Sequence, residues 1–249
     1  MKYLSLEFFK MRHRGIFLTI LFLLFMELAW CTFPLRRLIL PLASDSSEAV
    51  WEALIMIVTM VKGLLFSVMI AVAVCRVNDM EHKGNTWRLL ESSAERRESI
   101  WKAKFLSVFL LVSIAQVLES VYLVAYGSSM HIAEKFHIPA FLNYFIGSLA
   151  ISAVIILIQQ WISMTVENQL VAMAVGMLGG FLGLISMFLP SAVRYIFIWG
   201  YYVSLAPATF ADTGEIKQLP VSVIPTLIAL IMAVIFYYIG RRQFAKAES

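Results

Sequence analysis

The sequence predicts an all-α integral membrane protein, and three observations support this. Of the 249 residues, 61% are hydrophobic and only 14% are charged, against about 45–50% and about 25% in soluble domains. A soluble fold of this composition would expose apolar patches far larger than soluble monomers tolerate. Six apolar stretches are long enough to cross a bilayer as helices. None of them alternates as a membrane β-strand does, and helices satisfy their own backbone polar groups in lipid.

The six predicted transmembrane helices follow one another in a single domain of residues 1–249. They are expected at residues 15–33, 52–75, 103–126, 140–164, 169–189 and 220–240. Proline residues lie at several of these ends, where a missing N–H costs little; they are Pro34, Pro139, Pro190 and Pro220. No small-x-small cleavage site follows the first stretch, so we expect a retained span rather than a signal peptide.

The distribution of Lys and Arg predicts the orientation. The N-terminal segment, the loop between spans two and three and the C-terminal tail together hold 14 basic residues, whereas the opposite surface holds five. Cytoplasmic loops carry the excess of Lys and Arg, so both termini are expected in the cytoplasm. The net charge of +4 reflects this bias and does not indicate nucleic-acid binding.

Several kinds of chemistry find no support in the sequence. The pieces outside the predicted spans reach only about 30 residues, which leaves no room for a soluble catalytic domain. The chain has no G-x-x-x-x-G-K-[ST] phosphate loop, and its four histidines all fall outside the spans. We therefore expect no enzyme, no catalytic or metal-binding residue and no bound cofactor. The classes of protein that remain are a transporter, a channel, and a membrane scaffold or sensor.

The loop from Arg76 to Lys104 carries the first functional signal. It holds seven basic and five acidic residues. Met80, Gly84, Trp87 and Ala94 fall near one helical face, which predicts a short amphipathic helix on the membrane surface or in a partner's groove. A solvated connector whose charges keep it out of the bilayer is the open alternative.

This loop resembles the first cytoplasmic loop of type-2 ABC exporter permeases, in which it forms the coupling helix that docks on the ATPase. The resemblance rests on an acidic residue, a Gly-Thr-like step and a Leu-rich turn, followed by basic residues up to Lys104; Asn85 interrupts the step. It implies that the residues contacting an ATPase are Glu81, Gly84, Thr86, Trp87, Leu89 and Leu90.

The N-terminal segment agrees with this family. Glu7, Lys10 and Arg12 resemble its charged start. Leu4, Phe8 and Met11 share one helical face, so an N-terminal interfacial helix is expected, with its basic residues toward anionic headgroups.

The segment between spans five and six is unusually aromatic for an outer loop. Its aromatic residues include Tyr195, Trp199, Tyr201 and Tyr202. Short outer re-entrant helices, as in the same permease family, are expected; an ordinary interfacial aromatic belt is the alternative. The run RYIFIWGYY, the chain length and the six spans also resemble permease subunits of lantibiotic immunity transporters of the MutG and EpiG type.

Small residues in span five recur at a spacing of four. They are Ala172, Gly176 and Gly180 in one series, and Gly179 and Gly183 in another. Such spacing lets helix backbones approach closely, which predicts a packing face. Whether it packs within the chain or across a dimer stays open, although the family resemblance implies that spans one and five meet a second permease.

Three charged residues lie inside predicted spans and away from the span ends: Glu27, Lys62 and Glu119. Each is costly in lipid and should face protein or water. At about 1.5 Å per residue, the two carboxyls lie roughly 10 Å deep and Lys62 roughly 15 Å deep. We expect an intramembrane polar cluster with Lys62 between the carboxylates. It is either a structural tie between spans one to three, or a contact for cationic peptide or for gating.

Taken together, the resemblance implies the membrane subunit of an ABC exporter in a bacterial plasma membrane. Two ATPase subunits would use ATP and Mg, and a second, non-identical permease would complete the complex. The substrate would be an amphipathic peptide, such as a lantibiotic expelled from the membrane lipid for self-protection. The alternatives are a multidrug or lipid exporter of the same family and, from another class, a scaffold or sensor whose Arg76–Lys104 loop binds a signalling partner.

Overall fold

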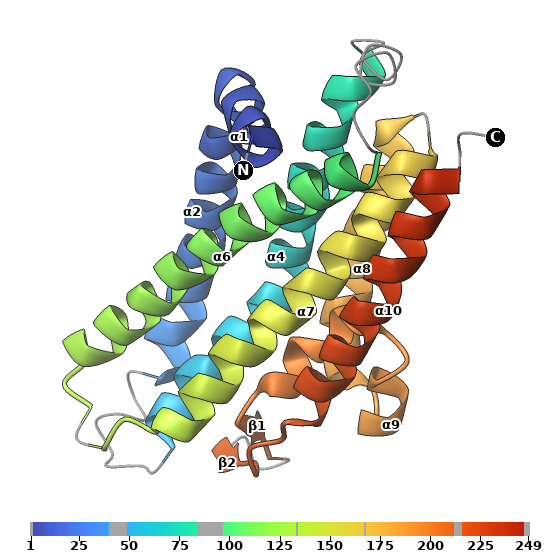
Figure 1. Cartoon of the computed structure of the whole chain (residues 1–249). Coiled ribbons are helices and arrows are strands. Elements are labelled where there is room, and N and C mark those ends of the chain that lie inside the picture. The colour runs from blue at the N-terminus through green and yellow to red at the C-terminus, as the bar shows by residue number, and fades with distance from the viewer. Residues whose placement is uncertain are drawn as a thin grey trace.

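A computed structural model describes residues 2–39, 49–83, 97–132, 134–166, 168–211 and 216–246. Six of its helices are long and apolar enough to cross a membrane, which confirms the predicted all-α fold with six spans (Figure 1). The spans comprise Ile16–Arg37, Val50–Asp79, Glu98–Ser129, Ile138–Thr165, Gln169–Phe188 and Ile224–Phe244.

The helices follow one another in antiparallel order. The bounds of the long helices are Lys2–His13 (α1), Ile16–Pro34 (α2), Val50–Lys83 (α4), Arg97–Ser129 (α6), Ile138–Thr165 (α7), Gln169–Ile185 (α8) and Ile224–Lys246 (α10). Figure 1 shows α1 and the last turns of α10 at the same end of the bundle, which we call the terminal end. The short elements after α8 lie toward the opposite end, which we call the far end.

The predicted N-terminal helix is α1, and it turns sharply into α2. Gly15 lies between them with a φ of 66°, a left-handed conformation that glycine adopts without strain. Met11 is fully buried, and Phe8 packs against the same core. The apolar face of α1 therefore lies against the bundle rather than entirely against lipid.

Two spans extend further than predicted. Helix α4 continues to Lys83 and α6 starts at Arg97, so both ends of the expected Arg76–Lys104 loop are helical. Buried polar partners support these extensions: the Asn78 side-chain amide donates to Ser163 Oγ at 3.0 Å, and Lys104 Nζ donates to the Val77 carbonyl at 3.1 Å. The sequence predicts the coupling helix in this Arg76–Lys104 segment. Glu81 of that prediction belongs to α4, and residues 84–96 lie outside the described residues.

Other ends also differ from the prediction. The helix passes through Pro34 into a π-helical turn, Leu35–Ile39 (η1), instead of stopping there. A wide π-helical turn tolerates the absence of the backbone N–H group that proline lacks. Helix α10 begins at Ile224 rather than at residue 220. Pro225 then occupies the first turn, where its missing N–H would have no intrahelical partner.

Short elements connect α8 to α10. They are Ser186–Phe188 (η2), Ser191–Arg194 (α9), Ile198–Tyr201 (η3), Val203–Leu205 (η4), Ala208–Phe210 (β1) and Ile216–Gln218 (β2). The two strands pair in antiparallel register, with Thr209 opposite Lys217. The sequence did not predict this hairpin, because three-residue strands are too short to show a period of two.

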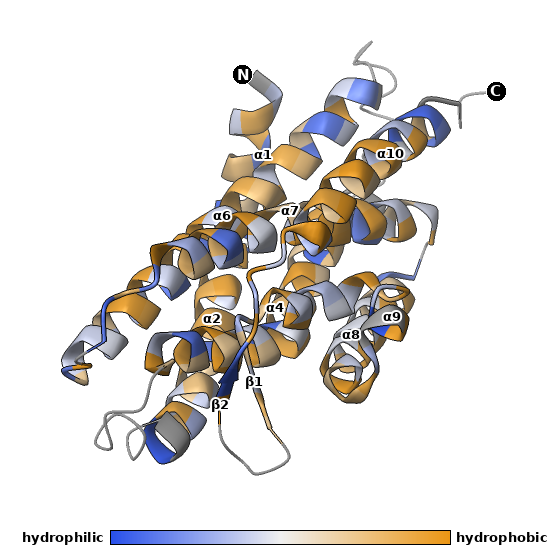
Figure 2. Ribbon diagram, turned by 90° about the horizontal axis from the view of Figure 1, so that it is seen from below, coloured by the Kyte–Doolittle hydropathy of each residue, from blue (hydrophilic) through white to orange (hydrophobic). Residues whose placement is uncertain are grey.

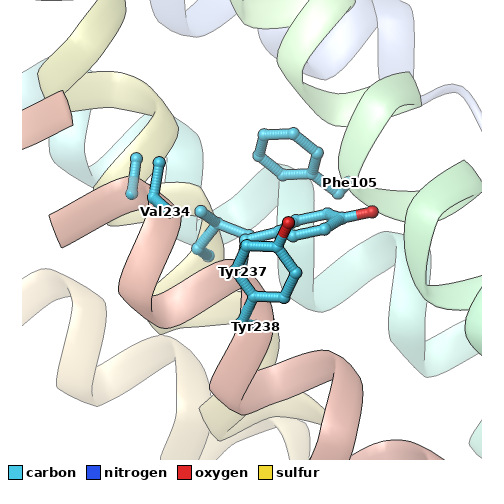
Figure 3. Close-up of a pocket in the computed structure, with 6 residues that line it drawn as sticks. Phe105, Val234, Tyr237 and Tyr238 are labelled. Carbon is cyan, nitrogen blue, oxygen red and sulfur yellow. The ribbon is translucent and has the colours of Figure 1, made fainter. Parts of the chain in front are cut away.

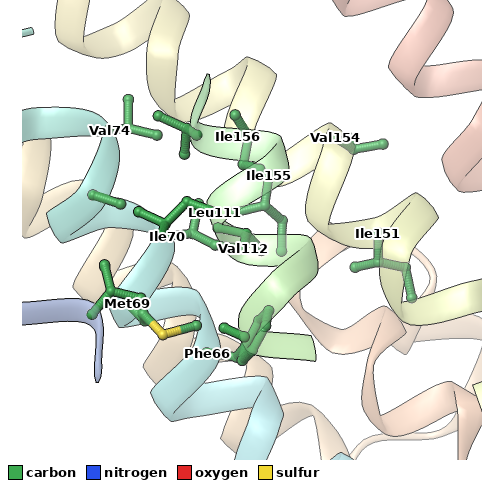
Figure 4. Close-up of a cluster of buried hydrophobic side chains, with 14 of the residues drawn as sticks. Phe66, Met69, Ile70, Val74, Leu111, Val112, Ile151, Val154, Ile155 and Ile156 are labelled. Atoms are coloured by element: carbon green, nitrogen blue, oxygen red, sulfur yellow. The ribbon is translucent and has the colours of Figure 1, made fainter. Parts of the chain in front are cut away.

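Helix α4 is the central element of the bundle and packs against α2, α6, α7 and α8. Its core residues Phe66 and Ile70 meet Val112 of α6 and Ile155 of α7 (Figure 4). The outer helices are hydrophobic on their free faces. Figure 2 shows α10 hydrophobic over most of its length and hydrophilic in its last turns, as a span needs where it leaves the lipid.

Candidate functional site

The structure brings the three predicted intramembrane charges together at the interface of α2, α4 and α6. The ammonium group of Lys62 donates to the carboxylate of Glu119, and both side chains are fully buried. Glu27 of α2 is also 0% exposed, and its carboxyl group interacts electrostatically with Glu119 and Lys62. These three residues form the intramembrane polar cluster.

Aromatic rings complete the surroundings of Lys62. Its Nζ atom lies 4.0 Å from the centroid of the Phe66 ring, 5.3 Å from that of Tyr144 and 6.0 Å from that of Tyr202. A cation over an aromatic face is stabilised by the ring quadrupole, most strongly where water is absent. Lys62 is therefore held by one carboxylate and three rings.

Glu27 has a different environment. Neither of its oxygens accepts a hydrogen bond from a described residue, and the same holds for Glu119 Oε1. The Tyr144 hydroxyl also has no partner in the described part of the chain. The cluster thus contains one ion pair and one additional carboxyl group.

Tyr202 reaches the cluster from the outer aromatic segment. Its hydroxyl hydrogen-bonds to Ser152 Oγ of α7 at 2.8 Å, and its ring meets Phe66 edge-on. Burial raises the pKa of this phenol above its usual value, so it stays neutral. The sequence predicted Tyr202 at the membrane interface, and the structure buries it. A buried tyrosine needs a hydrogen-bond partner for its hydroxyl, and that need is the signal that could have indicated a deeper position.

The other aromatic residues of this segment pack around the short helices. The Tyr201 hydroxyl donates to the Tyr195 carbonyl at 2.9 Å, and the two rings lie edge to face. Trp199 lies directly against Gly179 of α8. The guanidinium of Arg194 donates to the carbonyls at the end of α8 and η2, among them Ser186 at 3.0 Å, and burial lowers its pKa from the ordinary value.

The small-residue face of α8 lies against α4 within the chain. A Cβ atom on Gly180 would come within 2.9 Å of the Leu64 carbonyl, and one on Gly183 within 2.8 Å of the Gly63 carbonyl. Gly176 lies against Ala71 of α4. The Ala172 carbonyl accepts a hydrogen bond from Gln159 Nε2 of α7 at 2.6 Å.

A hydrogen-bonded layer crosses the terminal end of the bundle. Lys104 Nζ lies 3.4 Å from Glu7 Oε2 and donates to the Val77 carbonyl, which joins α1, α4 and α6. Gln160 of α7 donates to the Trp101 carbonyl at 3.0 Å, and Arg241 of α10 pairs with Glu98 at 2.5 Å. This terminal layer surrounds the two helix ends that flank residues 84–96. Glu81 lies in the last turns of α4, whereas Gly84, Thr86, Trp87, Leu89 and Leu90 lie outside the described residues.

A separate hollow lies between α6, α7 and α10. Its volume is about 320 Å³, and its walls are apolar and aromatic (Figure 3). Phe105 and Tyr237 both line it and pack edge to face with ring centroids 6.0 Å apart, and Val234 and Tyr238 complete the α10 side. Such walls suit apolar groups rather than charged ones.

Residues 3–183 match a family model described as an ABC-2 family transporter protein. This range covers more than two thirds of the chain. The chain belongs to the ABC-2 transporter family. It is accordingly a multi-pass membrane permease of an ABC exporter, and the family implies an ABC ATPase as its partner. No curated protein and no solved structure matches the chain significantly.

The matched range contains most of the candidate site. It spans α1 to α7 and nearly all of α8, and therefore the intramembrane polar cluster and all of the terminal layer except Arg241 of α10. The outer aromatic segment and α10 lie beyond it.

The chain is a transport subunit, and permeases of this family are generally non-catalytic. In the described ranges, no group of three or more His, Cys, Asp or Glu side chains is placed to hold a metal ion.

Proposed function

We propose that this permease expels a cationic, amphipathic peptide, such as a lantibiotic, from the bacterial plasma membrane for self-protection. It would work with two ABC ATPase subunits and a second, non-identical permease, and ATP and Mg would be used by the ATPases. Both termini would lie in the cytoplasm, so the terminal end of the bundle would face the ATPases. The single observation that supports coupling most directly is the terminal layer.

The terminal layer connects the helices that flank residues 84–96 to the rest of the bundle. Through Lys104, Trp101 and Glu98, the first turns of α6 contact α1, α4, α7 and α10. A displacement of residues 84–96 by a closing ATPase would therefore move several spans together. ATP binding would then shift the population between permease states, because the ATPase would bind one state more tightly.

The intramembrane polar cluster and the outer aromatic segment support the choice of substrate. Glu27 gives the cluster one carboxyl more than Lys62 can pair, and this excess suits a cationic group once the bundle opens. The aromatic segment, in which Tyr195 and Trp199 are only partly buried, suits the apolar face of the same peptide. The resemblance of the run RYIFIWGYY to lantibiotic immunity permeases supports the same choice.

A lipid or multidrug exporter is the second candidate, and the hollow between α6, α7 and α10 favours it. Its apolar walls and volume of about 320 Å³ would accept part of an acyl chain or a small apolar drug. The peptide proposal and this one differ in whether carboxyl substitution in the cluster affects export.

Copurification tests the coupling assignment. Trp87→Glu in the full-length permease should reduce recovery of the ATPase about tenfold or more, since a charged group would replace a hot-spot residue type in the proposed contact. Phe210→Glu, on the exposed strand β1 at the far end, is the control and should leave recovery unchanged. Normal ATPase recovery with a monodisperse Trp87→Glu permease would show that residues 84–96 are not the docking segment.

Survival of cells exposed to a lantibiotic tests the substrate. Glu27→Gln, which keeps the shape of the side chain, should leave the amount of folded permease unchanged and abolish protection. Retained protection against the peptide would contradict a role of Glu27 in cationic-peptide export. Lost folded protein would instead assign Glu27 to a structural tie between the first three spans.

A further inference from the structure

The charges of the intramembrane polar cluster do not balance when all of its groups are ionised. Two carboxyl groups, Glu27 and Glu119, meet one ammonium group, that of Lys62, and all three side chains are 0% exposed. The other titratable groups facing Glu27 are neutral side chains from α2, α7 and the outer aromatic segment, namely Cys31, Tyr144 and Tyr202. Fully ionised, the cluster would carry one uncompensated negative charge inside the membrane.

That extra charge would lack the contacts that stabilise buried carboxylates. Glu119 Oε2 accepts from Lys62, but Glu119 Oε1 and both oxygens of Glu27 accept from no described donor. The Glu27 carboxyl interacts with the carboxyl of Glu119, which is itself an acceptor. Two like charges this close and this deeply buried do not both stay ionised.

A single proton resolves both difficulties. It converts one carboxylate into a carboxylic acid whose O–H can donate to the other carboxylate. This removes the net charge and supplies the missing donor at the same place. No covalent or redox step is involved, because the proton is exchanged with water in an ordinary acid–base equilibrium.

We propose that Glu27 and Glu119 share one proton and form a proton-binding site in the middle of the bundle, neutral in total with Lys62. This site does not depend on which substrate the permease exports or on how the ATPase docks. The ligand is the proton itself, and the pair rather than either residue is the site.

Infrared spectroscopy of the full-length permease in lipid nanodiscs at neutral pH tests the proposal. A protonated carboxyl has a C=O stretching band that is separate from the carboxylate bands and shifts in deuterium oxide. The wild type should show one such band. Either Glu27→Gln or Glu119→Gln should remove it, because the remaining carboxylate then pairs with Lys62 in a neutral cluster.

Lys62→Met gives the opposite change and makes the test quantitative. Without the ammonium group, both carboxyls need a proton, so the band area should rise about twofold. Glu52→Gln is the matched control: Glu52 is buried near the far end of α4, pairs with His137 and lies outside the cluster. It should leave the Glu27-dependent band in place.

Two results would overturn the proposal. One is a wild-type spectrum in which Glu27→Gln removes no protonated-carboxyl band, which would mean that both carboxyls are ionised and hydrated. The other is a band that disappears in Glu27→Gln but persists in Glu119→Gln, which would place the proton on Glu27 without sharing. If Lys62→Met or Glu119→Gln does not yield folded protein, Glu27→Gln alone still decides whether the pair holds a proton.

Discussion

Lys62 is stabilised by more than its ion pair. The three aromatic rings around its ammonium group come from α4, α7 and the outer aromatic segment, and the nearest, Phe66, lies 4.0 Å away. In a site without bulk water, such contacts are worth about 2 kcal/mol.

A double-mutant cycle on Lys62 and Glu119 measures their coupling. We expect Lys62→Met to lower the free energy of unfolding by about 3 kcal/mol, since the buried carboxyls lose their counter-charge and must both bind a proton at neutral pH. Lys62→Met combined with Glu119→Gln should recover part of this loss, because the double variant contains only one buried carboxyl. Thermal unfolding in detergent would measure the stability of both variants. Additive losses would mean that the pair contributes no coupling energy.

Sequence reasoning at the level of residues found the charges of the cluster but not its aromatic partners. Glu27, Lys62 and Glu119 stand out because charged residues are rare in apolar spans. Tyr144 resembles any other ring in an apolar helix, and Tyr202 belongs to a segment whose depth depends on how the short helices fold back. Tertiary packing places these two rings, and no local pattern encodes it.

At the level of elements, α8 is attached to α4 by close backbone approach. A side chain on Gly183 would meet the Gly63 and Trp199 carbonyls, 2.8 and 2.9 Å from its Cβ. Both are backbone groups and cannot rotate away. The contact therefore fixes α4, α8 and the outer aromatic segment relative to one another.

We expect Gly183→Val to prevent α8 from packing and to reduce the yield of monodisperse permease severalfold, because overpacking against backbone has no cheap relaxation. Leu182→Val is the control on the neighbouring, lipid-facing position, where Leu182 is 39% exposed. It should change the yield little. Size-exclusion chromatography after matched expression would compare the two, and equal yields would show that the close approach is not required for folding.

The hydrogen bonds of the terminal layer lead to a second prediction, which concerns how α1 is held against α6. Lys104→Met should release α1 from α6, since Glu7 and the Val77 carbonyl would each lose a buried donor. Hydrogen–deuterium exchange of the α1 amides should become faster. Lys102→Met on the same helix is the matched control, because Lys102 is exposed. Unchanged exchange in Lys104→Met would mean that α1 is held by its apolar face alone.

The lengths of the elements could be predicted less well than their order. Apolar composition located all six spans, but it ended α4 at residue 75 and started α6 at residue 103. Polar groups such as Asn78 and Glu98 lie in these extensions, and partners on α7 and α10 satisfy them. A single sequence does not reveal those partners, and polar residues otherwise suggest a loop.

For the whole molecule, the antiparallel order and the basic residues predict which end faces the cytoplasm. Lys217→Cys on strand β2 should react with a membrane-impermeant maleimide in intact cells, whereas Arg242→Cys near the end of α10 should react only after lysis. The natural thiols give little background, since Cys31 and Cys75 are free but buried. The reverse labelling pattern would invert the proposed orientation.

The order of the charged residues along the chain also matters during membrane insertion. Synthesis proceeds from the N-terminus, so the span with Glu27 is made first, the span with Lys62 second and the span with Glu119 third. When Lys62 enters the bilayer, Glu27 has already been made, whereas Glu119 has not. Glu27 is therefore the first counter-ion available to Lys62, and Glu119 takes this place once α6 joins the bundle. The carboxyl that does not pair with Lys62 in the finished permease is thus the one that is made before it.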